Sequence, residues 1–567
     1  MKDYILTENN IILNFDKVTC QNEAKVLTSK PFSAVLASFI KTLKKDSRIN
    51  YAWILDEKLH KIIDVYTALL VWDFEDISKS KDFFIKETYR ESFYEFTEEF
   101  YDYWRRIERY GFFNQIKPYD ELISSQRLVD ASSEFTTLIV RLYRTVAQKI
   151  KGTNFNMLRQ LPAGTNANLM FVANPWSKSV LYKDLPHQAF ISSLIVRPPL
   201  IIYSKANTRT GLFKPVKVNP LSGLTFDESE WVIYPLWIGN YLAYMYTHRD
   251  FLHHAVSLGS LFETASFEDF KHKKPDIIYF FGIDQKEFDG TYFYDKKENI
   301  YIGTVTKDDK NDYFGYAKKM LLTLHNVKAQ DEGKLPIHGA MVELILNDGK
   351  IKNIVLIGDS GAGKSEAIEA LRLVGKDKIN EINIIYDDMG IFYEDHGKVK
   401  SIGTEIGAFV RLDDLDQGYA YHQMDRAVFL NPNKVNARVI LPASPYYFIT
   451  KPHNIDYVLY ANNYYETKQG IEIFERLEDV LPIFEKGARL AKGTTSEIGM
   501  SESYFANPFG AVQHKELAEK LLKKYFNKLY ETGVKVGVLY TQLAIPGYEQ
   551  KGPQMAAMSL LDLLTKS

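Results

Sequence analysis

The sequence is poor in cysteine, and Cys20 is the only one among 567 residues. A single thiol excludes a disulfide framework and any metal site built from several cysteines. Long apolar runs are missing too. None approaches the ~20 residues that span a bilayer, and the first ten residues lack the apolar core of a signal peptide. These absences predict a cytoplasmic protein with no membrane partner.

An excess of charge of one sign is also absent. Lysine and arginine together number 70 and aspartate and glutamate 72, which leaves a formal net charge of −2. Proteins that bind nucleic acids usually present a strongly basic surface or tail, and no block of basic residues occurs here. We therefore expect no nucleic-acid partner, and we expect phosphorylated small molecules to be bound by a local positive site. The oligomeric state is left open.

The length exceeds what one hydrophobic core usually supports, and the pattern of the sequence changes twice. Residues 1–155 are predicted to be mainly helical, residues 156–330 contain short β-type runs broken by turns, and residues 331–567 alternate strands and helices. The fold class is therefore α/β. One helical face of the first region, which a buried core or a subunit contact explains better than a ligand platform, carries large side chains at three- and four-residue steps: Phe93, Phe96, Phe100, Trp104 and Ile107.

A glycine-rich loop gives the first chemical signal. An apolar run at residues 354–357 leads into the loop, and an amphipathic helix follows it. Strand, loop and helix in this order are the setting of a phosphate-binding loop, whose backbone amides and helix N-terminus attract an anion. Lys364 would supply a point charge and Ser365 a magnesium ligand. The loop residues are Gly358, Asp359, Ser360, Gly361, Ala362, Gly363, Lys364 and Ser365.

Acidic and basic residues around the loop extend this site. The next predicted strand ends in Asp387 and Asp388, where carboxylates can hold a metal beside the phosphates; an acidic turn is the alternative. His338 precedes the loop, although a lone histidine is more often a core or surface residue. Arg438 lies in an apolar, strand-like stretch, so its charge requires an anionic partner. Together these residues indicate a metal-dependent enzyme that handles a phosphoryl group.

With these pieces in order, residues 313 to 547 resemble phosphoenolpyruvate carboxykinase. Residues 313–319 are similar to the family's Tyr-x-Gly-Glu-Met-Lys-Lys stretch, and Lys319 and His338 keep the family's separation of 19 positions (338 − 319). Asp387 and Asp388 match its paired aspartates. Further blocks resemble the family in the same order, namely residues 405–411, 436–438, 491–497, 507–511 and 533–539. No such resemblance covers residues 1 to about 200.

The resemblance implies a two-lobed fold, with a P-loop in the C-terminal lobe and a helical N-terminal extension. It implies metal ligands at Lys319, His338 and Asp388, with Ser365 and Asp387 beside a second ion. It places Glu405 and Gly407 near the nucleotide, and residues 491–497 in a mobile lid. Arg438 would span the transferred phosphate and the substrate. Arg209 is a candidate for the substrate carboxylate, with a surface-loop arginine as the equal alternative.

The implied reaction converts oxaloacetate to phosphoenolpyruvate and CO₂ with Mn²⁺ and Mg²⁺. The phosphoryl donor stays open, because residues 540–552 lack the family's Gly-Lys-Arg-Ile segment near the purine; a nucleoside triphosphate or pyrophosphate are both candidates. The loop itself is closer to HPr kinase/phosphorylase, a relative with the same nucleotide core. A kinase of that type, acting on a hydroxyl of a protein or small molecule, is the second hypothesis, and an inactive binding protein is the third.

Overall fold

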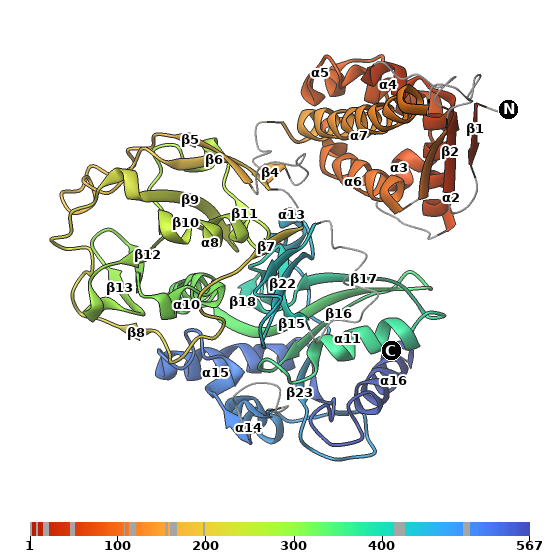
Figure 1. The fold of residues 1–567 in the computed structure, drawn as a ribbon. Helices are drawn as coiled ribbons and strands as arrows, with labels where there is room; N and C mark the ends of the chain where they lie inside the picture. Colours follow the sequence, from red (N-terminus) through yellow and green to blue (C-terminus); the bar gives the residue numbers. More distant parts are fainter. Residues whose placement is uncertain are drawn as a thin grey trace. The chain divides into compact units, whose positions relative to one another are not determined.

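The computed structural model describes residues 3–6, 10–14, 22–45, 51–106, 108–112, 121–152, 157–158, 167–196, 199–412, 426–491 and 499–566. The chain divides into two compact units, Met1–Gly164 and Thr165–Ser567 (Figure 1). The first boundary lies close to the expected end of the helical region at residue 155. Beyond it, the two lobes expected from the sequence belong to one compact unit.

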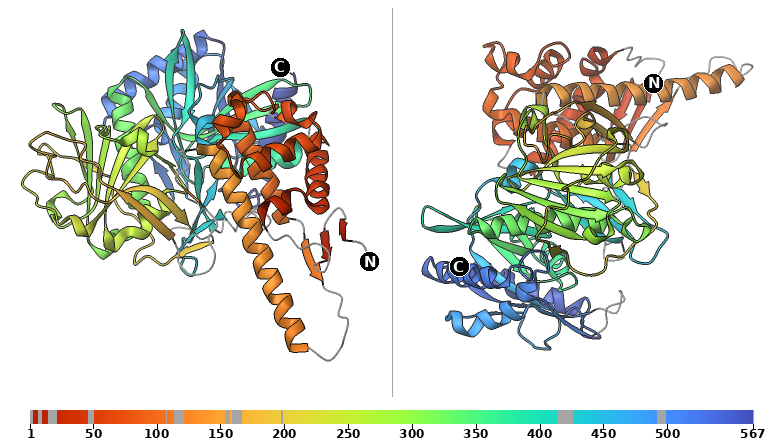
Figure 2. Two further views of the ribbon diagram at one scale, coloured as in Figure 1. Left: turned by 90° about the horizontal axis from the view of Figure 1, so that it is seen from above. Right: turned by 90° about the vertical axis from the view of Figure 1, so that its left-hand side faces the viewer.

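The first unit is mainly helical, as its apolar periodicity predicts, but it also contains a small sheet. Strand β2 pairs with β1 antiparallel and with β3 parallel, a sheet that the sequence did not predict. Figure 2 shows α7 as one continuous helix. The elements are β1 (Tyr4–Leu6), β2 (Asn10–Asn14), α1 (Glu23–Leu27), α2 (Lys30–Lys45), α3 (Ala52–Leu55), α4 (Leu59–Ala68), α5 (Phe74–Lys79), α6 (Arg90–Arg106), β3 (Glu108–Phe112) and α7 (Glu121–Lys151).

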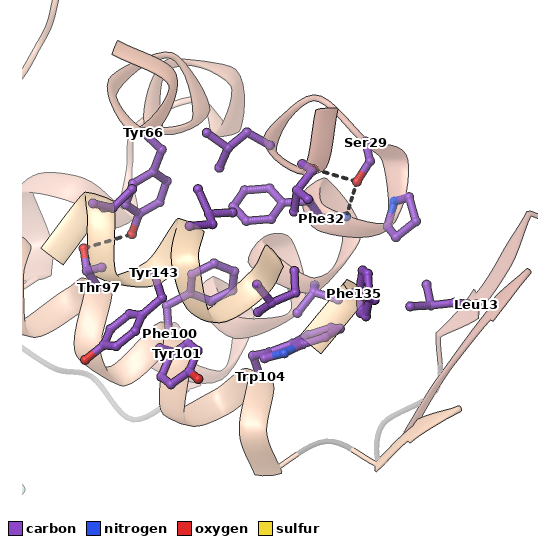
Figure 3. A pocket seen from close by; sticks show the side chains of 17 residues that line it. Leu13, Ser29, Phe32, Tyr66, Thr97, Phe100, Tyr101, Trp104, Phe135 and Tyr143 are labelled. Atoms are coloured by element: carbon purple, nitrogen blue, oxygen red, sulfur yellow. Dashed lines mark hydrogen bonds between the residues drawn. The ribbon is translucent and has the colours of Figure 1, made fainter. Parts of the chain in front are cut away.

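The predicted aromatic face lies on α6 and points into this unit. Phe93 and Phe96 are fully buried, which confirms the core interpretation for these two residues. Phe100 and Trp104 line an almost wholly apolar cavity (Figure 3). Ile107, the fifth residue of the predicted face, lies outside the described residues. The face therefore packs inside this unit, where large aromatic side chains stabilise the fold by burying apolar area.

The second unit is mixed α/β and begins with a large sheet that contains the strand order β6-β9-β10-β12-β14-β13-β8. Its central strands β10, β12 and β14 are buried along their whole length, and β12 runs parallel to β10 and β14. Helix α10 (Phe314–Asp331) follows this sheet and is buried along most of its length. The strands are β5 (Ala167–Val172), β6 (Phe190–Val196), β8 (Lys214–Pro215), β9 (Trp231–Ile238), β10 (Tyr241–His248), β12 (Ile277–Ile283), β13 (Thr291–Asp295) and β14 (Ile300–Thr306).

A second mixed sheet of this unit carries the predicted phosphate loop and has the order β19-β18-β15-β16-β23-β27-β24, with β17 also paired to β15. Helices α11 and α16 pack on one face, and α14 and α15 on the other (Figure 1). The bounds are β15 (Leu335–Leu346), β16 (Ile351–Ile357), α11 (Lys364–Val374), β17 (Ile379–Tyr386), β18 (Met389–Asp395), β19 (Lys398–Gly403), β23 (Tyr457–Asn462), β24 (Ile471–Ile473), α14 (Leu477–Lys486), α15 (Lys515–Glu531), β27 (Lys535–Tyr540) and α16 (Lys551–Lys566).

A smaller sheet joins distant parts of the sequence. Strand β22 (Arg438–Pro442) lies between β20 (Gly407–Arg411) and β21 (Val428–Leu430), and β21 pairs in parallel with β7 (Leu200–Ile202). The strands predicted before the loop, before Asp387 and at Arg438 are all confirmed. In the part of the chain that the structure describes, no helix is both long and apolar enough to cross a membrane.

Candidate active site

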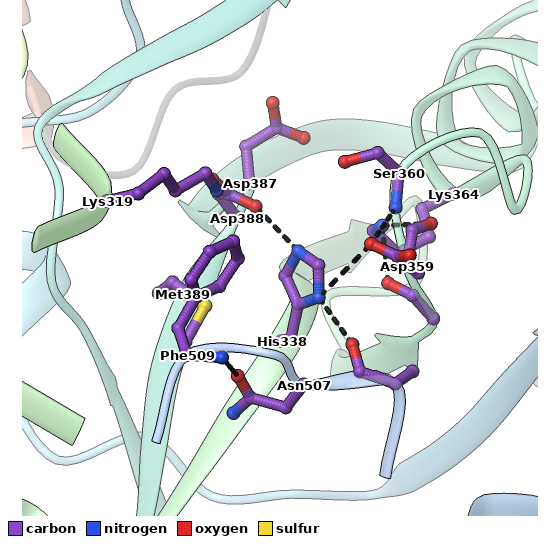
Figure 4. A network of polar contacts seen from close by, with 12 residues as sticks. Lys319, His338, Asp359, Ser360, Lys364, Asp387, Asp388, Met389, Asn507 and Phe509 are labelled. Carbon is purple, nitrogen blue, oxygen red and sulfur yellow. Dashed lines mark hydrogen bonds and ion pairs between the residues drawn. The ribbon is translucent and has the colours of Figure 1, made fainter. Parts of the chain in front are cut away.

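The predicted phosphate loop connects the end of β16 to the start of α11, in the strand, loop and helix order that the sequence predicts (Figure 4). Gly361 and Gly363 have φ values of +81° and +93°, a region that side chains disfavour and glycine adopts freely. A Cβ on Gly363 would also lie 2.6 Å from the side chain of Thr541. The Thr541 hydroxyl donates to the carbonyl of Ala362 at 2.7 Å. The glycines therefore allow both the turn and its close packing against the segment after β27.

Lys364 is the buried cation of the loop. Its Nζ donates to the carbonyl oxygens of Gly358 at 2.7 Å and Asp359 at 3.1 Å, so it lies across the loop that it is predicted to serve. The adjacent Ser365 hydroxyl donates to Asp387 at 3.4 Å. The structure thus brings together Lys364, Ser365 and the first of the two predicted aspartates.

Asp359 is held within the loop by two contacts. Its carboxylate accepts from the backbone amide of Ser360 at 2.7 Å and from Arg489 Nε at 2.8 Å. Burial opposes ionisation, but His338 and Arg489 hold the pKa of Asp359 below its usual value. Arg489 is a residue that the sequence did not single out. It lies in β25 (Ala488–Leu490), which pairs with β26 (Met500–Glu502). The predicted lid spans residues 491–497, and all of it after residue 491 lies outside the described residues.

Asp388 is the point at which the predicted metal ligands meet. It follows β17 and precedes β18, and both strands pair with β15, which carries His338. His338 Nε2 lies 3.0 Å from Asp388 Oδ1, and Lys319 Nζ lies 2.6 Å from Asp388 Oδ2 (Figure 4). The pairing of β15 with β18 therefore places His338 beside Asp388, and Lys319 reaches the same carboxylate from helix α10.

The contact of the other ring nitrogen of His338 shows which of the two nitrogens carries the hydrogen in a neutral ring. Nδ1 lies 2.6 Å from the carbonyl oxygen of Ala506. A carbonyl only accepts, so Nδ1 carries the hydrogen, and a neutral ring then directs the Nε2 lone pair at the Asp388 carboxylate. Two lone pairs facing each other at 3.0 Å require a proton or a cation between them. A histidine that ligates a metal usually donates its second N–H to a carbonyl in this way.

A second lysine, Lys318, also contacts Asp388, and no feature of the sequence singled it out. Lys318 Nζ lies 2.6 Å from Asp388 and 2.8 Å from Glu405, and its side chain is almost fully buried. Burial opposes the charge, but Asp388 and Glu405 hold the pKa of Lys318 above its usual value. Burial lowers the pKa of Lys319 to about 8. Lys318 therefore holds its proton as the ion-pair partner, and Lys319 is the amine that loses its proton more easily.

The pKa values of the three buried carboxyl groups shift in opposite directions. Burial would raise the pKa of Asp388, but the two lysines and His338 hold it well below its usual value. Burial raises the pKa of Asp387 to about 6 and that of Glu405 to about 7. Asp388 is thus the ionised anchor of the site. The pKa of Asp387, beside Ser365, is raised towards neutral pH, and a carboxylate with such a pKa can act as a general base.

Each candidate arginine lies over an aromatic ring that one of these lysines also contacts. Arg438 Cζ lies 5.4 Å from the ring centroid of Phe409, and Lys318 Nζ lies 5.3 Å from the same centroid. Arg438 Nε is buried and makes no hydrogen bond to the described residues. Such a group favours an anionic ligand. The ring of Phe509 is contacted in the same way by Arg209 and Lys319, with Arg209 Cζ 5.6 Å and Lys319 Nζ 4.3 Å from its centroid. Burial lowers the pKa of Arg209.

The two residues expected near the nucleotide have other contacts. Glu405 is the buried partner of Lys318. Gly407 begins β20, where its amide donates to the carbonyl of Leu261 at 3.3 Å and a Cβ would lie 2.3 Å from the carbonyl of Ser260. The contacts of Gly407 therefore explain the glycine by close backbone packing.

Gly407→Ala should lower the thermal unfolding midpoint, because the added methyl must displace backbone. Overpacking of this kind typically costs about 1–3 kcal/mol. Differential scanning fluorimetry would measure the midpoint, with Ala408→Ser as the control, since Ala408 is only half-buried. An unchanged midpoint together with weakened donor binding would instead support a nucleotide contact.

Comparison with known proteins does not assign the chain to a family. No protein-family model matches it, and no curated protein sequence does.

Proposed function

We propose that this protein is a phosphoenolpyruvate carboxykinase-like enzyme, with the two-lobed fold of that family. It would convert oxaloacetate to phosphoenolpyruvate and CO₂ with a nucleoside triphosphate or pyrophosphate as phosphoryl donor. The observation that carries the proposal is the meeting of Lys319 and His338 on Asp388, in the same unit as a phosphate loop with a buried Lys364. A phosphate loop alone would support many enzymes, whereas an amine, an imidazole and a carboxylate together are an unusual donor set.

The donor set fits a metal of Mn²⁺ type. Lys319 Nζ, His338 Nε2 and the Asp388 carboxylate would hold it, because nitrogen ligands suit Mn²⁺ better than Mg²⁺, which prefers oxygen. Ser365 and Asp387 supply the oxygen ligands suited to Mg²⁺ on the donor phosphates. When bound, these ions supply positive charge that stabilises an enolate oxygen and transferring phosphate. The lowered pKa of Lys319 supports this role, since only a neutral amine has a lone pair to donate.

The other candidate site residues would bind the substrates and stabilise the group in transfer. As oxaloacetate loses CO₂, the bond electrons form an enolate. Its oxygen attacks the terminal phosphorus of the donor, while the bond to the leaving nucleoside diphosphate, or to phosphate when pyrophosphate is the donor, breaks. Lys364 would hold the donor phosphates, and Arg438 would bridge the phosphoryl group in transfer. Arg209 would bind the substrate carboxylate. The segment 491–497 would exclude water from the enolate.

A kinase of HPr kinase/phosphorylase type is the second candidate. Asp387 favours it, because burial raises the pKa of this carboxyl to about 6 and it lies beside the donor loop. In that enzyme Asp387 would accept the proton of an attacking hydroxyl. Lys319 would then have no metal to bind.

One assay separates these candidates. Purified protein is incubated with oxaloacetate, Mn²⁺ and Mg²⁺, in parallel with ATP, GTP or pyrophosphate, and phosphoenolpyruvate is measured. The carboxykinase proposal expects its formation with at least one donor. Failure with every donor, combined with phosphorylation of a serine-containing protein or small alcohol, would support the kinase instead.

Arg438→Lys should reduce turnover by roughly 10- to 1,000-fold with a much smaller change in donor affinity. A planar guanidinium can bridge two oxygens at once, and an ammonium cannot. Steady-state kinetics give turnover and donor KM separately. Arg411→Lys, on the paired strand position of β20, is the matched control for arginine loss in this sheet. Normal turnover in Arg438→Lys would show that Arg438 only stabilises the fold.

A further inference from the structure

A second group of metal-binding side chains lies apart from the Asp388 cluster. His253 and His254 belong to α8 (Leu252–Leu258), and Asp312 lies just before α10, which begins at Phe314. Both imidazole Nε2 atoms lie 2.9 Å from the same carboxylate oxygen, Asp312 Oδ1. One ligand atom from each residue lies within 4.8 Å of the others. Two donors that each lie about 2.1 Å from a tetrahedral ion are roughly 3.4 Å apart, so each histidine nitrogen would need to move only about half an ångström away from Asp312 Oδ1 for an ion to bind between them.

The carboxylate of Asp312 is buried without a fixed cation. Its side chain is 6% exposed, and within the described parts of the chain no lysine or arginine approaches it to within 4.0 Å; the nearby Lys205 pairs with Asp309. Burying an ionised carboxylate is costly unless a cation balances it. Two imidazole N–H groups would satisfy its hydrogen bonding but would not balance its charge if both rings are neutral. A divalent ion would do both.

The surroundings hold the three ligands in place. His254 is fully buried, with ring contacts to Phe281 at 5.4 Å and Phe314 at 6.2 Å between centroids. Asp312 Oδ2, the oxygen not shared by the histidines, accepts from the backbone amide of Lys205 at 2.9 Å. His253 is 29% exposed, so the cluster borders solvent on the side of this residue. An orienting hydrogen bond on the ligand carboxylate and an apolar shell are typical of protein metal sites.

We propose that His253, His254 and Asp312 form a second metal site, selective for a Zn²⁺-like divalent transition metal. Two imidazoles and one carboxylate suit Zn²⁺, whereas Mg²⁺ prefers oxygen ligands. None of its three ligands takes part in the proposed reaction. It joins α8 and the start of α10 to residues 205 and 206, whose amides donate to Asp312. The same segment leads to Arg209, so the ion would stabilise the loop that carries this arginine.

The test counts bound zinc in full-length protein stripped with a chelator. Zn²⁺ is added, unbound metal is removed by gel filtration, and the protein is analysed by mass spectrometry for metal content, with affinity from isothermal titration. Lys319→Ala serves as the background, since it disables the Asp388 cluster. In this background we expect one tightly bound Zn²⁺ per chain, which excess Mg²⁺ does not displace. Adding His253→Ala should weaken it by more than about 100-fold, because losing a ligand exceeds the loss typical for a ligand's hydrogen-bonding partner.

Two further variants keep the result interpretable. Asp312→Asn retains the shape and the contact with Lys205 but removes the charge, and it should also lose the ion while melting normally in chelator. His60→Ala removes an exposed histidine of α4 and should leave the zinc content unchanged. Zn²⁺ should raise the thermal midpoint of the Lys319→Ala protein, but not of the double variants that add His253→Ala or Asp312→Asn. Equal zinc affinity with and without His253 would overturn the proposal and leave a hydrogen-bonded triad only.

Discussion

Lys364→Ala should reduce phosphoryl transfer by roughly a thousandfold or more, because a positive charge on transferring phosphate contributes several powers of ten to the rate. In the structure the Lys364 ammonium donates to two carbonyl oxygens of its own loop, so the substitution removes only local hydrogen bonds. We therefore expect the fold to survive. Turnover would be measured by phosphoenolpyruvate formation, and folding by the thermal midpoint.

The matched control for this experiment is Lys376→Ala, which removes an exposed lysine two residues beyond the end of α11. It should retain normal turnover. If Lys364→Ala also keeps near-normal transfer, the loop is not the donor site, and both the carboxykinase and the kinase proposals fail.

Lys319→Ala should abolish activation by micromolar Mn²⁺ in the presence of millimolar Mg²⁺, and decarboxylation with it. Donor binding at Lys364 should persist, since the lysine contacts Asp388 and not the loop. Lys319→Arg is the sharper variant. It keeps a cation beside Asp388, but a guanidinium stays protonated and cannot ligate a metal, so it should be equally inactive with Mn²⁺. Kinetics with varied Mn²⁺ and calorimetric titration of the donor measure the two effects.

The same amine sets a pH dependence. Its pKa is lowered to about 8, so protons compete with the metal below that pH, and the apparent Mn²⁺ affinity should fall as pH decreases from 8 to 6, by up to about tenfold per pH unit. Above pH 8 the affinity should level off. If Lys319→Ala is silent and Mg²⁺ alone gives full activity, the carboxykinase proposal fails and the kinase takes its place, while the Lys364 result stays unaffected.

Local patterns predicted much of the second unit. The apolar run before Gly358, the glycines and the helix after Lys364 specify strand, turn and helix through neighbouring residues alone, and the structure has all three. The strand before Asp387 and the strand at Arg438 were predicted for the same reason. The small sheet of β1, β2 and β3 was missed, because β2 and β3 are about a hundred residues apart in the chain and their pairing leaves no local signal.

The candidate site also has features that the sequence predicts and features that depend on the tertiary structure. The sequence by itself determined which groups could do the chemistry: a phosphate loop with Lys364, two adjacent aspartates, and Lys319 and His338 at a spacing shared with a known family. Only the tertiary structure decided how they are charged and what surrounds them. The pairing of Lys318 with Glu405, the contact of Arg489 with Asp359 and the meeting of His253 with Asp312 all join residues from 59 to 130 positions apart. Such contacts depend on sheet register and helix packing, and the burial that lowers the pKa of Lys319 exists only once those elements are packed together.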